Sequence, residues 1–257
     1  MTNVVVLIIA IYVYVALSRQ ISARVTTDAE PGRMLGLPEA LVAGFLVFIF
    51  LLGVLGATSG QPAAVDTRVL LETLLVTLAI VLFIVALLTF RGFDLNALAG
   101  FSKISFLRAI STGIILLIAA YPLIAVSEMI SQNIIGGGSS KQSIVELFGS
   151  SDTIGQRVMI IVFAVAIAPV LEEFLFRFFL YSVLRRYFGR FFGVAFNSLL
   201  FAAVHTHLPS FAPLFVFGIC LTVAFEWSGS ILVSMTMHSL FNALSLTALA
   251  FPEFLSQ

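Results

Sequence analysis

The sequence of 257 residues has few charged residues and a single cysteine. Charged residues make up 10% of the chain, where soluble globular domains carry about a quarter. Thirteen Lys and Arg balance thirteen Asp and Glu, so no basic surplus is present to bind nucleic acid. Cys220 has no partner for an intramolecular disulfide, and its apolar neighbours predict a packed, inert thiol. These shortages argue against a nucleic-acid-binding protein and against a disulfide-stabilised secreted domain.

Hydrophobic residues, in contrast, make up 60% of the chain. A membrane-spanning helix needs about 20 mostly apolar residues, and about eight segments qualify. They lie at residues 3–18, 39–56, 69–90, 105–129, 156–184, 191–206, 211–227 and 231–250. The first segment follows no Lys or Arg and precedes no small-residue cleavage site, so we expect a retained helix and not a signal peptide. The sequence predicts an all-α, polytopic membrane protein with a single transmembrane domain over residues 1–257.

The distribution of Lys and Arg predicts the orientation in the membrane. Positive charges favour cytoplasmic loops. Most of them fall in alternate loops: Arg19, Arg24, Arg33, Arg91, Lys103, Arg185, Arg186 and Arg190. We therefore expect both termini outside the cytoplasm and the turn at 185–190 inside it. The protein is expected in the plasma or inner membrane if its source is prokaryotic.

The fifth segment contains charged residues within "APVLEEFLFRFF" (168–179). One charge at the bilayer centre costs about 3 kcal/mol on insertion scales. Glu173 and Arg177 stand four positions apart, so they share a helix face and can pair. Glu172 points about 100° away and has no such partner. Pro169 is expected to kink the helix just ahead of both carboxylates.

Histidines on later segments are the candidate partners of Glu172. "FAAVH" ends in His205, and "HSLFN" begins with His238 and ends in Asn242. Counted along each helix from the cytoplasmic boundary, Glu172 and both histidines reach a depth of about 20 Å. We therefore expect these side chains to converge on one polar cavity inside the bundle. His207 is expected at a helix end or loop and is the substitute if His205 is not the partner.

Such a cavity contains the chemical groups needed to hydrolyse a peptide or amide bond. A glutamate beside a histidine can deprotonate water as a general base, and a second histidine with an asparagine can donate hydrogen bonds to an oxyanion. No serine or cysteine in these segments has the neighbouring histidine that a covalent mechanism needs. Two glutamates and three histidines could in principle ligate zinc, but the compact His-Glu-x-x-His pattern is absent, and we expect no metal or other cofactor.

The ordered motifs "EEFLFR", "FAAVH" and "HSLFN" resemble the CAAX-processing and bacteriocin-immunity (CPBP or Abi) family, whose best-known members are type II CAAX prenyl endopeptidases. The resemblance spans residues 168–244, within a motif core of about 156–250. It implies a metal-independent, glutamic-type intramembrane protease. Phe178 departs from the family, which commonly has glycine after the motif arginine, and a bulky residue there bears on substrate entry.

The roles that the resemblance implies fall on six residues. Glu172 and His205 would activate the water. His238 and Asn242 would form the oxyanion site. Glu173 and Arg177 would support the arrangement, in line with the pairing expected from their spacing.

Three functions compete at this point. The leading hypothesis is an endopeptidase acting on a membrane-anchored protein or peptide, such as a prenylated substrate or a C-terminal tail, within the lipid bilayer. The alternative is a non-catalytic scaffold or bacteriocin-immunity protein, a role that the resemblance also allows. A proton-coupled transporter is the third, against which stands the lack of paired interrupted helices in two related halves.

Overall fold

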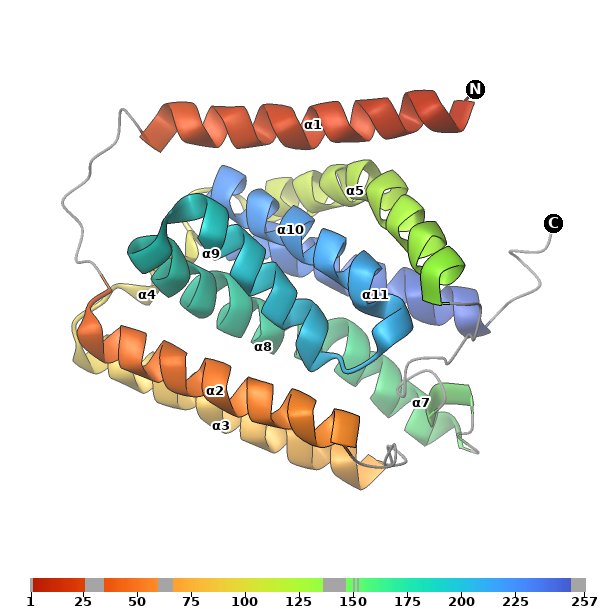
Figure 1. Cartoon of the computed structure of the whole chain (residues 1–257). Coiled ribbons are helices and arrows are strands. Elements are labelled where there is room, and N and C mark those ends of the chain that lie inside the picture. The colour runs from red at the N-terminus through yellow and green to blue at the C-terminus, as the bar shows by residue number, and fades with distance from the viewer. Residues whose placement is uncertain are drawn as a thin grey trace.

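The computed structural model describes residues 2–25, 35–59, 67–135, 147–149, 151 and 153–250 of the chain. These residues form helices joined by turns (Figure 1). The α-helices are α1 (Thr2–Val25), α2 (Leu37–Ser59), α3 (Thr67–Phe90), α4 (Leu95–Ala99), α5 (Phe106–Ile135), α7 (Ile154–Ile161), α8 (Ala168–Glu173), α9 (Ser182–Val204), α10 (Phe211–Ser228) and α11 (Ile231–Ala250). Two π-helical stretches, η1 (Val162–Ile167) and η2 (Phe174–Tyr181), and one 3₁₀ turn, η3 (Leu208–Ser210), complete the described part.

Within the described residues, 7 helices are long and apolar enough to cross a membrane. One of them, Ile154–Val204, has 51 residues and breaks at Gly189, where φ is 78° and ψ is 171°. The chain folds back there, so that Gly193 lies against the backbone of Arg185. Figure 1 shows the two halves running side by side. This long helix therefore covers the predicted segments 156–184 and 191–206, the latter up to Val204. The polytopic all-α fold is confirmed with about the expected number of spans.

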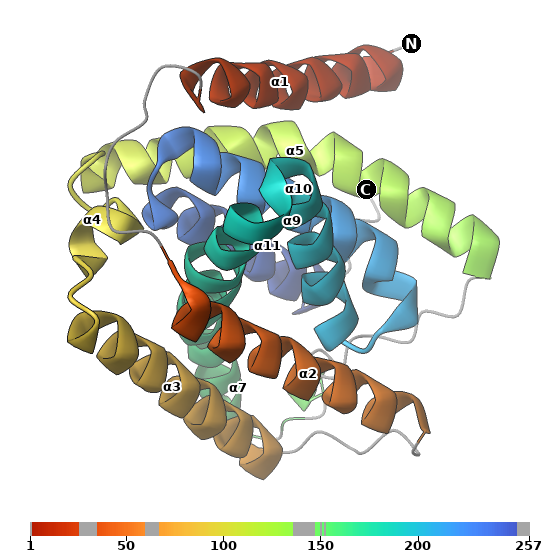
Figure 2. The same ribbon diagram turned by 60° about the vertical axis from the view of Figure 1, so that its left-hand side comes forward.

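The helices that follow α4 form the centre of the molecule. Helix α10 packs against α9 and α5, and α11 packs against α5. Helix α1 lies across α5 and α10, while α2 lies beside α9 and α3 lies beside α8 (Figure 2). Small residues allow close approach, since a Cβ on Gly113 of α5 would lie 2.7 Å from Thr236 Cβ of α11. The large apolar side chains on the outer faces of α1, α2 and α3 are exposed, as expected for lipid-facing helices.

Polar contacts tie the ends of several helices together at the 185–190 turn. Glu226 of α10 is almost fully buried and pairs with Arg185 at 3.0 Å and with Arg190 at 2.7 Å. Arg190 also donates to Ser18 Oγ of α1 at 2.9 Å. Trp227 Nε1 donates to Gln20 of the same helix at 2.8 Å. These bonds hold α1 against the α9–α10 end of the bundle.

The helix does not end at Pro169. Ile167 before it keeps helical angles, with φ −83° and ψ −54°, and α8 continues through Glu173. The distortion expected at the proline instead takes the form of the wider turns η1 and η2 on either side of α8. Such π-helical insertions are frequent at functional sites. They flank α8, which carries both carboxylates.

Candidate active site

Three of the predicted site residues meet between α8, α9 and α11. His238 Nε2 lies 3.7 Å from Glu172 Oε2, and His205 Nε2 lies 4.0 Å from the same oxygen. Glu172 and His205 keep 28% and 24% of their side-chain surface exposed, whereas His238 keeps 3%. The similar depth expected from the sequence thus corresponds to close proximity of these side chains. The open side of the cluster is the one that Glu172 and His205 face.

Glu173 pairs with Arg177, as its spacing predicted. Arg177 Nη1 lies 2.9 Å from Glu173 Oε1, and neither side chain has exposed surface. The same oxygen lies 2.9 Å from His238 Nδ1. The guanidinium carbon of Arg177 also lies 4.2 Å from the centre of the Phe201 ring, a cation–π contact. The bond from Glu173 to His238 was missed by the sequence reasoning, because it joins residues 65 positions apart.

Hydrogen-bond partners fix the tautomer of each histidine when its ring is neutral. His205 Nδ1 lies 2.7 Å from the carbonyl oxygen of Phe201, which can only accept, so Nδ1 carries the proton. The carboxylate of Glu173, paired with Arg177, likewise accepts from His238 Nδ1. Both rings therefore present Nε2 to Glu172. This is the arrangement by which a second polar group commonly orients a functional histidine.

Aromatic rings surround the two imidazoles. The Phe201 ring centre lies 4.8 Å from that of His205 and 5.6 Å from that of His238. Phe217 of α10 packs edge-on against His238 at 5.7 Å. Phe176 in turn packs edge-on against Phe201. These contacts limit rotation of the imidazoles and lower the local dielectric around the charges.

The other two polar residues singled out from the sequence have partners of their own. Asn242 Nδ2 donates to the carbonyl oxygen of Ala164 at 2.8 Å, across the gap between α11 and η1. His207 Nδ1 lies 2.7 Å from Ser210 Oγ within the turn that follows α9. His207 thus lies in a loop, as expected, and directs one ring nitrogen into that loop. Among the described residues, no three His, Cys, Asp or Glu side chains have an arrangement suited to a metal ion.

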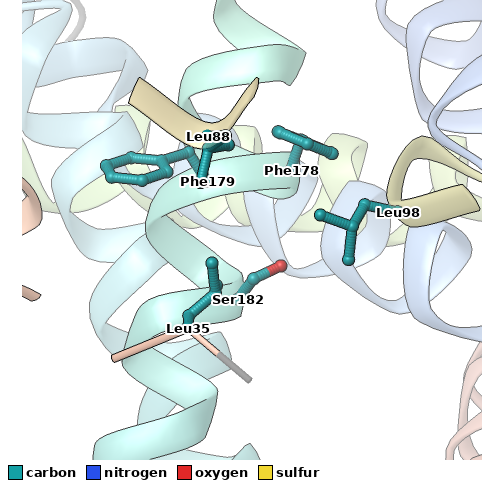
Figure 3. A pocket seen from close by; sticks show the side chains of 6 residues that line it. All are labelled: Leu35, Leu88, Leu98, Phe178, Phe179 and Ser182. Carbon is teal, nitrogen blue, oxygen red and sulfur yellow. The ribbon is translucent and has the colours of Figure 1, made fainter. Parts of the chain in front are cut away.

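A small hollow lies beside η2 and the start of α9, on a different surface from the cluster. Figure 3 shows its lining: Leu35, Leu88, Leu98, Phe178, Phe179 and Ser182. None of the six predicted site residues lines it. Phe178, the departure from the family pattern, is buried, stacks on Phe174 at 4.6 Å and forms part of this wall. Its ring therefore lines this hollow together with Leu88 of α3 and Leu98 of α4 and stands apart from the carboxylate–histidine cluster.

Fold and site together define a helical membrane protein with carboxylates and histidines clustered between its spans. Residues 154–244 match the family model described as type II CAAX prenyl endopeptidase Rce1-like. This range includes all six residues predicted from the motifs. The match covers about a third of the chain, and this part of the protein is similar to the CAAX-processing membrane proteases that the motifs indicated. No curated protein and no solved structure matches the chain.

Proposed function

We propose that the protein hydrolyses a peptide bond of a membrane-associated substrate by a glutamic-type mechanism, in which Glu172 and His205 activate water. One observation carries this proposal. The Nε2 atoms of His205 and His238 both lie within 4.0 Å of one oxygen of Glu172. The family is one of proteases, so the reaction type has a precedent in the matched domain.

The distances in the cluster suit a water molecule. Separations of 3.7 Å and 4.0 Å are too long for direct hydrogen bonds. They are short enough for one water to bond with Glu172 and with a histidine at the same time. That water donates one hydrogen to the carboxylate of Glu172 and the other to Nε2 of neutral His205. Both acceptors raise the nucleophilicity of its oxygen.

The charges of the cluster indicate the role of the other histidine, His238. Because His238 Nδ1 donates to Glu173, its Nε2 is a donor only when the ring is an imidazolium. Glu172 and Glu173 carry two negative charges, and Arg177 compensates one of them. A proton on His238 makes the cluster neutral, which lowers the free-energy cost of burying its charges. In this state His238 donates from Nε2 to the oxyanion, and Glu173 and Arg177 hold it in place.

The reaction then balances as follows. The water oxygen bonds to the substrate carbonyl carbon while Glu172 takes a proton, and the carbonyl oxygen becomes an oxyanion that accepts from His238 Nε2. The tetrahedral intermediate collapses, the C–N bond breaks, and Glu172 returns the proton to the leaving amine. Asn242 is proposed as a second oxyanion donor through the amide hydrogen that does not bond with Ala164. No step uses a covalent intermediate or a metal.

The exposure of the site residues indicates the class of substrate. Glu173 and Arg177 are fully buried, whereas Glu172 and His205 are partly exposed, so the substrate approaches from the latter side. Because the cluster lies between spans, that substrate is itself membrane-anchored. A prenylated C-terminal tail fits the description of the matched family, and other membrane-bound peptides have the same chemistry at the scissile bond.

The experiment compares new protein termini across the membrane proteome by mass spectrometry. Wild type and Glu172→Gln are expressed in a strain that lacks the protein. Glu72→Gln is the matched control, because Glu72 is an exposed partner of Arg68 on α3, far from the site in sequence. We expect termini that depend on wild type or Glu72→Gln and disappear with Glu172→Gln. If Glu172→Gln gives the same new termini as wild type, the proposal is contradicted. If no cleavage is seen and Glu172→Gln has the same phenotype as wild type, a non-catalytic scaffold is favoured.

A further inference from the structure

Pro169 leaves one backbone carbonyl of the site helix without its usual donor. The N–H of Ala168 donates to Phe163, five residues back, which is the register of the π-helical stretch η1. In that register the next donor, residue 169, would bond with the carbonyl of Ala164. Proline has no N–H, so this bond cannot form within the helix. Ala164 is itself buried, so its carbonyl has limited access to other donors.

The side chain of Asn242 occupies this position. Its Nδ2 donates to the Ala164 carbonyl oxygen at 2.8 Å, although the two residues are 78 positions apart. We infer that Asn242 is a positioning residue, which supplies from α11 the hydrogen bond that Pro169 removes from the helix carrying Glu172. An asparagine amide has two hydrogens, so this bond leaves the second one for the oxyanion.

The geometry gives this bond a consequence for catalysis. Asn242 lies one turn after His238 on α11, and Ala164 lies about two turns before Glu173. Two hydrogen bonds, from His238 to Glu173 and from Asn242 to Ala164, thus connect the same two segments in antiparallel order. A single bond would let α11 slide or rotate relative to α8. Two of them fix the position of His238 Nε2 relative to Glu172.

A double-mutant cycle tests this inference, which rests on the proposed function only for its catalytic consequence. The purified full chain carries Asn242→Ala, Pro169→Ala or both, and thermal unfolding is followed in detergent. We expect Asn242→Ala to lower Tm by about 5 °C in the wild-type background. In the Pro169→Ala background the same change should have little effect, because a backbone N–H then reaches the Ala164 carbonyl. Asn133→Ala, which removes an exposed amide bonded to the Met129 carbonyl, is the matched control and should leave Tm unchanged.

Cleavage of a farnesylated peptide gives the second readout. Asn242→Ala should lower kcat more than it raises KM. The double variant Pro169→Ala/Asn242→Ala should have a kcat about tenfold higher than that of Asn242→Ala. If the loss in kcat and in Tm is equal in both backgrounds, Asn242 does not act through Ala164 and the inference is overturned. The Tm cycle decides this even if the peptide is not cleaved, so failure of the proposed function is separable. Should Asn242→Ala not fold, recovery of folded protein by added Pro169→Ala supports the inference, and no recovery overturns it.

Discussion

Arg177 is a fully buried cation among apolar side chains, and its contacts explain why the chain tolerates it. Its charge is compensated by Glu173 at 2.9 Å, and the face of Phe201 offers a further favourable contact. Glu173 is compensated in turn by Arg177 and by the N–H of His238. Removing either member of such a pair leaves the other as an uncompensated buried charge. The free-energy cost of burying these charges therefore depends on the whole cluster and not on any single residue.

This reasoning makes a prediction for Arg177. Arg177→Met should destabilise the protein by about 3–5 kcal/mol, because it leaves Glu173 without its cation. The double variant Glu173→Gln/Arg177→Met should lose less stability than Arg177→Met, although it removes more polar groups. Chemical unfolding in detergent measures both. Equal destabilisation of the single and double variants would contradict the pairing as the cause.

The charge state of His238 gives a second prediction. With ¹⁵N-labelled histidine, the imidazole shifts of His238 in the active protein should show both ring nitrogens protonated, as the proposed charge balance requires. Glu173→Gln keeps an acceptor for Nδ1 but removes one negative charge, so it should release the Nε2 proton. Turnover should then fall by about 10²–10³-fold, the usual cost of losing an oxyanion donor. His207, bonded to Ser210 outside the cluster, is the internal reference, and a neutral His238 in the wild type would refute the assignment.

Among the elements, the turn at Gly189 decides how the site is assembled. It reverses the chain within α9, between η2, which carries Arg177, and the end of α9 next to His205. Its φ of 78° with ψ of 171° is a conformation essentially restricted to glycine. Apart from its chain neighbours and the backbone of its own helix, no atom of the described residues lies within 4 Å of the place where a Cβ would stand, so backbone strain alone opposes substitution.

Gly189→Ala should therefore destabilise the protein by about 1–3 kcal/mol. Gly155→Ala is the matched control, because Gly155 also has open space around it but lies in the helix α7, where alanine is the better helix former. It should leave Tm unchanged or raise it slightly. Thermal unfolding compares the two, and equal effects would show that the conformation at 189 is not under constraint.

The same elements show which features the sequence could reveal. Apolar length predicts spans, and the spacing of Glu173 and Arg177 predicts their pair, because both depend on local geometry. The contact between Glu173 and His238 depends on the crossing angle between α8 and α11. No short motif in either apolar segment predicts that crossing angle. The bond from Asn242 to Ala164 was hidden for the same reason. Pro169 signalled a distortion but not the two π-helical stretches that absorb it.

At the scale of the whole molecule, the loops expected in the cytoplasm gather at one end. Arg24 at the end of α1 donates to the Trp227 carbonyl at 2.9 Å, and Arg190 donates to Ser18. Gly100 lies so close to Gly229 that a side chain would not fit between them. The turn after α9 lies elsewhere, where Ser131 of α5 donates to the Pro209 carbonyl. The grouping of these loops at one end agrees with the alternation of positive charge along the chain. That alternation also predicts which end of the protein faces the cytoplasm.

Cysteine labelling in intact cells tests that orientation. Tyr187 is exposed in the 185–190 turn, and Asn133 is exposed near the end of α5, next to the opposite group of loops. The native Cys220 is 2% exposed and gives little background. The excess of positive charge around Tyr187 predicts that Asn133→Cys reacts with an impermeant maleimide and that Tyr187→Cys reacts only after permeabilisation. The reverse pattern would invert the topology. Because His205 directly precedes the turn on the Asn133 side, the expected result would place the water-activating residues in the outer half of the bilayer, and substrates would have to reach them from that leaflet.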